Sequence, residues 1–137
     1  MPIPRLYRYI FYRAYLWRLS QKSMGSGPEF DSALFIAAAH MMYVLGFIAL
    51  FAIYFTPINH LFYDKITGRI LVIIIAILSI VIHEYSFLSN GNAKKIIDEY
   101  KDSRMTKLGG VLVTSYFVFS FIFVFITAAL SALINYI

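Results

Sequence analysis

The sequence predicts an all-α integral membrane protein with three transmembrane helices, and its composition and its charge-free stretches carry this fold class. Hydrophobic residues make up 61% of the 137 residues and charged residues 14%, whereas soluble domains average about 45–50% and about 25%. A soluble domain of this size buries only about two-thirds of the surface of its unfolded chain, which is too little to hide so many apolar side chains. We therefore expect one membrane domain over residues 1–137.

Residues 1–24 predict an amphipathic helix that lies in the membrane interface. At 100° per residue, one face of this helix is apolar and the basic side chains lie elsewhere. The glycines and the proline of residues 25–28 separate it from the first span. The apolar face consists of Ile3, Leu6, Tyr7, Ile10, Ala14 and Trp17. The residues expected to contact lipid, including anionic headgroups, are Arg5, Arg8, Arg13, Trp17, Arg18 and Lys22.

Residues 33–55, 70–88 and 108–137 are the expected spans. A helix needs about 20 residues to cross a hydrocarbon core of ~30 Å, and the first and third stretches contain no Asp, Glu, Lys or Arg. The middle stretch carries His83 and Glu84 near its end. We interpret it as a span because the distribution of basic residues requires one there.

The connections between the spans predict the orientation. Residues 56–69 hold only Lys65 and Arg69, while the rest of the 12 basic residues precede the first span or lie in residues 89–107. The side rich in Lys and Arg is cytoplasmic under the positive-inside rule. We therefore expect a bacterial inner-membrane protein with a cytoplasmic N-terminus, a periplasmic C-terminus and 56–69 as the outer loop.

Residues 89–107 predict a turn followed by a short amphipathic helix on the cytoplasmic side. Ser89-Asn90-Gly91-Asn92 is a turn signal. Ala93, Ile96, Ile97, Tyr100 and Arg104 then recur at helical spacing, with charged residues between them.

The three spans place polar side chains at a similar depth, just below the inner headgroups. Ionisable residues inside a membrane are costly, so they are candidates for function. At 1.5 Å per residue, His40 and His83 lie roughly 10 Å and 8 Å from the cytoplasmic ends of their spans. The residues of this inner polar layer are His40, His83, Glu84, Thr114 and Ser115.

Three interpretations of the inner polar layer stay open. Its members could hydrogen-bond one another to fix helix packing, and we expect the His40 and Glu84 side chains to lie within hydrogen-bonding reach, directly or through one water. Glu84 could instead point to the interface beside Lys94 and Lys95. The histidines and the carboxylate could also bind a metal or relay protons. However, His83 and Glu84 are adjacent and point about 100° apart on a helix, which disfavours a shared ion.

Several classes of function find no support in the sequence. The chain has no cysteine, which excludes disulfides, thiolate metal sites and Cys nucleophiles. It also lacks phosphate-binding loops, nucleophile elbows and Asp-rich metal motifs. We therefore expect no enzymatic activity and no cofactor. Arg and aromatic residues alternate near the N-terminus, but beside three spans we expect lipid and not nucleic acid as their partner.

The chain resembles a group of small three-span inner-membrane proteins of Bacteroidota whose function is uncharacterised. The resemblance rests on the basic, Tyr-rich N-terminal segment, on Gly25-Ser26-Gly27-Pro28-Glu29-Phe30 and on Ile96-Ile97-Asp98-Glu99-Tyr100. It implies the three-span architecture and no particular activity.

The leading functional hypothesis is a non-enzymatic membrane protein that acts by association, as an accessory subunit of a membrane complex or as a homo-oligomer. Small residues four apart in the third span, Thr127 with Ser131 and Ala128 with Ala132, favour close helix packing. The alternatives are a membrane-permeabilising or channel-forming effector and a protein that handles metal or protons through the inner polar layer.

The charge distribution makes a direct prediction about topology. A reporter that is active only in the cytoplasm should be active when fused to the N-terminus and inactive when fused to the C-terminus. Cytoplasmic activity of the C-terminal fusion would contradict three spans with a cytoplasmic N-terminus.

Overall fold

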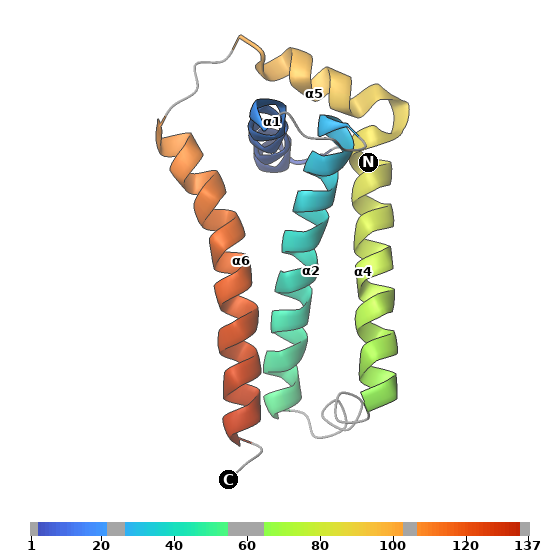
Figure 1. The fold of residues 1–137 in the computed structure, drawn as a ribbon, viewed down its shortest axis with the longest axis vertical. Helices are drawn as coiled ribbons and strands as arrows, with labels where there is room; N and C mark the ends of the chain where they lie inside the picture. Colours follow the sequence, from blue (N-terminus) through green and yellow to red (C-terminus); the bar gives the residue numbers. More distant parts are fainter. Residues whose placement is uncertain (1–2, 22–26, 55–64, 103–106, 135–137) are drawn as a thin grey trace.

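The structure is a computed structural model that describes residues 3–21, 27–54, 65–102 and 107–134 (Figure 1). No strand occurs in these ranges, and three helices are long and apolar enough to cross a membrane. The all-helical class with three membrane-length helices is thus confirmed. The long helices are α2 (Pro28–Tyr54), α4 (Lys65–Leu88) and α6 (Lys107–Ile134). The shorter elements are α1 (Arg5–Ser20), the 3-10 turn η1 (Ser89–Gly91) and α5 (Asn92–Tyr100).

The helix α2 begins at Pro28, before the apolar stretch that starts at residue 33. Gly27, the residue just before this helix, has a φ of 115°, which is not a helical conformation. Proline suits the first position of a helix because the missing N–H has no partner there. Glu29 and Asp31 lie in the first turn, where carboxylates interact favourably with the positive end of the helix dipole. The helix therefore includes a polar turn that hydropathy alone leaves out.

The three long helices lie side by side with α2 in the middle (Figure 1). The helix α2 packs against both α4 and α6. Along the chain, α2 and α6 run in one direction and α4 returns in the other. The helices α1 and α5 lie at one end of this layer, and α1 crosses the long helices and is seen nearly end-on in Figure 1.

A turn between α4 and α5 redirects the chain across that end. Asn90 and Gly91 have φ values of 54° and 67°, and Gly and Asn adopt this left-handed region most readily. The short helix that follows, α5, buries Ala93, Ile96 and Tyr100, three of the residues that recur at helical spacing in the sequence. Arg104, the last member of that pattern, lies outside the described residues.

Burial is concentrated at the end of the layer where α1 and α5 lie. Away from this end the long helices expose large apolar side chains, for example Phe47, Ile77 and Phe125. Such a surface is expected of helices that face hydrocarbon rather than water. The buried cluster consists of Ile10, Phe11, Tyr12, Ala33, Ile36, Phe87, Ala93, Ile96 and Tyr100.

The helix α1 packs against protein on several sides, unlike the expected interfacial helix that turns one apolar face to lipid. It contacts α2, α5 and α6. Phe11 and Tyr12, outside the predicted apolar face, are buried, whereas Leu6 and Trp17 within that face are exposed. The periodicity identified an amphipathic helix, but it did not distinguish an apolar face that meets lipid from one that meets other helices.

The stacked pair of Phe11 and Phe87 should dominate the docking of α1. Their ring centroids lie 4.7 Å apart with an interplanar angle of 7°, and Phe11 is fully buried. Phe11→Ala should lower the free energy of unfolding by about 3–5 kcal/mol and expose α1 to protease. Leu6→Ala is the matched control, because Leu6 is 65% exposed on the same helix. Equal effects of the two variants would contradict this packing.

Candidate functional site

A chain of hydrogen bonds joins α1, α2 and α4 through two histidines. His40 of α2 contacts His83 of α4 directly, through its Nδ1 atom and the Nε2 atom of His83. The other nitrogen of His40, Nε2, lies 2.9 Å from the hydroxyl of Tyr7 on α1. The Nδ1 atom of His83 lies 2.7 Å from the carbonyl oxygen of Ser79. Each ring is half-buried, and each uses both of its nitrogens.

The last link of this chain fixes the direction of the others. A carbonyl oxygen only accepts hydrogen bonds, so Nδ1 of His83 carries the proton and donates it to Ser79. In a neutral ring Nε2 of His83 is then an acceptor, and Nδ1 of His40 must donate to it. The remaining nitrogen of His40 accepts the hydrogen bond that the Tyr7 hydroxyl donates.

Two further tyrosines extend this group, Tyr116 beside His40 and Tyr43 beside Tyr116. The hydroxyl of Tyr43 donates to the backbone carbonyl of Tyr116 at 3.1 Å, which links α2 to α6. The ring of Tyr116 lies 6.2 Å from the ring of His40. The Tyr116 hydroxyl is itself buried and makes no hydrogen bond within the described part of the chain. We call Tyr7, His40, Tyr43, His83 and Tyr116 the Tyr–His cluster.

Of the predicted inner polar layer, the structure brings together only the two histidines. Glu84, Thr114 and Ser115 are exposed. The expected hydrogen bond between His40 and Glu84 is wrong, because Tyr7 and His83 occupy the two ring nitrogens of His40. Glu84 follows His83 on the same helix and points about 100° away from it. Its side chain borders a shallow hollow together with Phe30, Ala33, Leu34 and Ile80.

Sequence reasoning missed the tyrosines of the Tyr–His cluster, although signals for two of them were present. Tyr7 lies on the predicted apolar face of α1, where a hydroxyl needs a partner once the ring is buried. Tyr43 is three residues after His40 and therefore shares its face of α2. No spacing signal connects Tyr116 on α6 to either residue, because only the tertiary fold brings that helix close.

Ion pairs tie both ends of α1 to its neighbours. Near its C-terminus, Arg18 donates from Nε at 3.0 Å and from Nη2 at 2.5 Å to a single carboxylate oxygen, Oδ2 of Asp31 on α2. The Arg18 guanidinium also lies 5.8 Å from the centre of the Trp17 ring. Nearer its N-terminus, Arg8 pairs with Glu99 of α5 at 2.6 Å.

The residues predicted to contact lipid thus fall into different environments. Arg8 and Arg18 have carboxylate partners in the protein. Arg13 is half-buried, and its guanidinium lies where a side chain at Gly110 of α6 would collide with it. Arg5 and Trp17 are exposed, and Lys22 lies outside the described residues.

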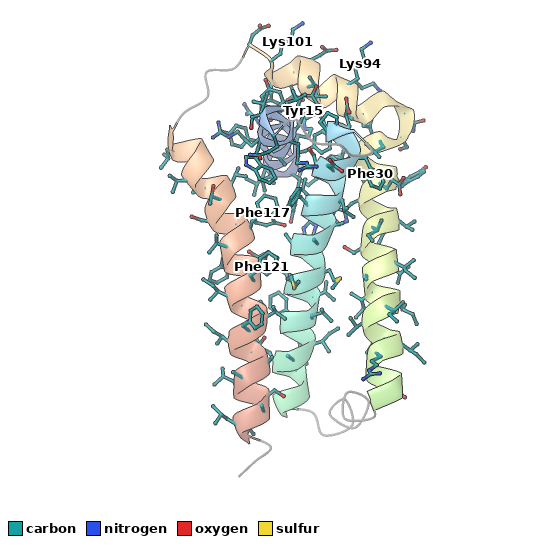
Figure 2. All side chains as sticks on the ribbon, in the orientation of Figure 1. Tyr15, Phe30, Lys94, Lys101, Phe117 and Phe121 are labelled. Carbon is teal, nitrogen blue, oxygen red and sulfur yellow. The ribbon has the colours of Figure 1, made fainter. Side chains whose placement is uncertain are left out.

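Tyr15 adds a half-buried phenol to the docked face of α1. Burial raises the pKa of Tyr15, and the nearby Glu29 carboxylate and Tyr12 raise it further. A neutral hydroxyl is the form that a partly buried helix contact tolerates. The label in Figure 2 places Tyr15 on α1, under α5.

The Tyr–His cluster is suited to handling protons rather than to holding an ion. Within residues 3–21, 27–54, 65–102 and 107–134, no three His, Cys, Asp or Glu side chains gather as metal ligands. The facing nitrogens of His40 and His83 are in hydrogen-bonding contact. A zinc ion would need about 2.0–2.1 Å to each nitrogen, so it does not fit between them.

The Arg18–Asp31 pair should contribute measurably to stability because both side chains are largely shielded, with 20% and 13% exposure. In a double-mutant cycle with Arg18→Gln and Asp31→Asn, we expect a coupling energy of about 0.5–3 kcal/mol in thermal unfolding. The exposed pair of Lys101 and Asp98, 4.0 Å apart, is the control and should couple by less than about 0.5 kcal/mol. Equal coupling of the two pairs would rule out a special role for Arg18.

Comparison of the chain with protein-family models, with curated proteins and with solved structures finds no match. No relative therefore contributes a function, and the proposals below rest on the residues and contacts described above.

Proposed function

We propose that this chain is a non-enzymatic, multi-pass inner-membrane protein that acts by association, either with another membrane protein as its accessory subunit or with its own copies. The support for a membrane location is the exposed apolar surface of α2, α4 and α6. In water such a surface would cost about 25 cal/mol for each Å² left exposed, whereas lipid tails solvate it.

The distribution of exposed basic side chains supports a cytoplasmic location for the end that carries α1 and α5. Arg5, Lys94, Lys95 and Lys101 are exposed there, and Figure 2 shows Lys94 and Lys101 on the outer side of α5. Each Lys or Arg near an anionic membrane surface contributes about 1 kcal/mol of attraction. Anionic headgroups are therefore the proposed lipid partner of this end.

The observation that carries the association proposal is that the small residues of α6 lie on two sides of the helix, one buried within the protein and one exposed. Thr127 faces the protein, with 2% exposure, and its hydroxyl donates to the carbonyl of Phe123 at 2.9 Å. Ala128 and Ala132 are exposed. Two small residues four apart on an outward face let a second helix approach closely, whereas contact with lipid alone does not require them.

The open arrangement of the long helices leaves room for such a partner. Each outer helix packs against the central α2 (Figure 1). The opposite faces of α4 and α6 expose apolar side chains such as Ile77 and Phe125. A partner helix could dock on α6 without displacing any contact described within the chain.

Cysteine cross-linking in membranes tests this proposal with little background, because the chain contains no cysteine. Ala128→Cys and Ala132→Cys should form disulfide-linked products on oxidation, since helices in contact through small residues approach closely. Ile126→Cys is the matched control, because Ile126 is exposed, lies at a similar depth and points about 200° away from Ala128 around the helix.

The product of cross-linking separates the two forms of association. A dimer of the chain supports a homo-oligomer, and a mixed product with a second membrane protein supports an accessory subunit. Ala128→Leu should suppress the Ala132→Cys product several-fold, because a bulky side chain keeps the helices apart. Cross-linking no stronger at Ala128 and Ala132 than at Ile126 would contradict association through this face.

A further inference from the structure

We infer that His40 and His83 form a binding site for one additional proton, which the two rings share and which Tyr7 exchanges with the end of the molecule that carries α1. The inference is independent of the proposed association, since it concerns other residues. It rests on the unbroken contact from the Tyr7 hydroxyl through both imidazoles to a backbone carbonyl.

When Tyr7, His40 and His83 are all neutral, the hydrogen bonds between them allow one consistent arrangement of protons. The Ser79 carbonyl requires a proton on Nδ1 of His83, and this in turn requires a proton on Nδ1 of His40. Both rings are then the Nδ1–H tautomer, and the Tyr7 hydroxyl donates into the chain. A histidine without a fixed partner has no such constraint. The tautomers of His40 and His83 therefore report directly on whether these hydrogen bonds form.

An added proton can enter by reversing two links. The hydroxyl proton of Tyr7 moves to Nε2 of His40, and the proton on Nδ1 of His40 moves to Nε2 of His83. The Tyr7 oxygen takes the incoming proton from a water or hydronium and becomes a hydroxyl again. His83 then carries protons on both nitrogens as an imidazolium, and His40 carries its single proton on Nε2. The Tyr7–His40 and His40–His83 hydrogen bonds persist with their directions reversed. The hydrogen bond from Nδ1 of His83 to the Ser79 carbonyl keeps its direction.

The surroundings favour the binding of one proton over two. Two imidazolium rings in direct contact repel each other, so a second proton on the pair is disfavoured once the first is bound. The side chains that lie against the rings are Tyr7 from α1, Tyr116 from α6 and Phe87 from α4, none of which is a carboxylate. Glu84, the next residue on α4, is exposed.

The two ends of the hydrogen-bond chain, Tyr7 and Ser79, indicate a proton store rather than a path across the membrane. At one end, the Ser79 carbonyl accepts a hydrogen bond but has no proton to pass on. At the other end, Tyr7 belongs to α1 and is only half-buried. After reversal, the Tyr7 hydroxyl needs a new acceptor, and the buried, unpartnered Tyr116 hydroxyl belongs to the same cluster. Protons therefore enter and leave on the side of α1.

The test is nitrogen NMR of the full chain in lipid bilayers, with ¹⁵N-labelled histidine and a His60→Gln variant to assign the third histidine. Near neutral pH, His40 and His83 should both show a protonated Nδ1 and an unprotonated Nε2. On acidification, one ring should become doubly protonated while the other changes to the Nε2–H form, so that the pair gains one proton. An Nε2–H tautomer in either ring at neutral pH, or independent uptake of two protons, would overturn the inference.

Two tyrosine variants test the role of Tyr7. Tyr7→Phe removes the hydroxyl but leaves the His40–His83 contact, so the neutral tautomers should persist while uptake and release of the added proton by the pair slow at least several-fold. Tyr85→Phe is the control, because Tyr85 is 71% exposed on α4 and should leave exchange unchanged. Unchanged exchange in Tyr7→Phe would show that protons reach the pair by another route and would remove Tyr7 from the site.

Discussion

The docking of α1 across the end of the long helices is the constraint on which the rest of the structure depends. Phe11 is fully buried against Phe87, and α5 packs on α1 as well as on α4. Without α1, the polar end of the layer would lose the centre of its buried cluster. The same helix supplies Tyr7 to the histidine pair, so the candidate site exists only while α1 is docked.

The long helices and the end that carries α1 and α5 differ in how their apolar side chains are solvated. Along the long helices, side chains such as Ile77 and Phe125 stay exposed, which is tolerable only where the surroundings are as apolar as they are. At the end with α1 and α5, apolar side chains are buried as in a soluble protein, and charged groups such as Arg18 and Asp31 pair. This division explains why a small chain can be mostly exposed and still have a defined core.

The sequence predicts the long helices well because hydropathy over about 20 residues is a strong signal, and Gly27 with Pro28 marked the break before α2. It predicts the face of α5 as well, since Ala93, Ile96 and Tyr100 keep helical spacing. The environment of α1 was not predictable in the same way. A helical period gives the direction of an apolar face but not the identity of what covers it. The burial of Phe11 against Phe87 of α4 and of Tyr12 against Tyr100 of α5 therefore required the tertiary structure.

The candidate site shows a similar limit. Depth along the spans identified His40 and His83 as neighbours in one layer, but it also favoured Glu84, since depth alone cannot separate adjacent residues. The position around the axis of α4 separates the two residues, because His83 faces α2 and Glu84 is exposed. The costly desolvation of a charge is thereby avoided, because the long helices bury neutral imidazoles that satisfy each other and leave the carboxylate at the surface.

The histidine pair and the outward face of α6 lie at different levels along the long helices, and this separation bears on how the two proposals combine. His40 lies near the middle of α2, where it contacts Tyr7 of α1, whereas Ala128 and Ala132 are near the end of α6. Perturbations at well-separated sites without shared partners are expected to add. The main connection between them is α2, which packs against both α4 and α6. Tyr43, with its hydroxyl on the Tyr116 carbonyl, is the described contact best placed to transmit such a change, because it connects the histidine-bearing helix to α6.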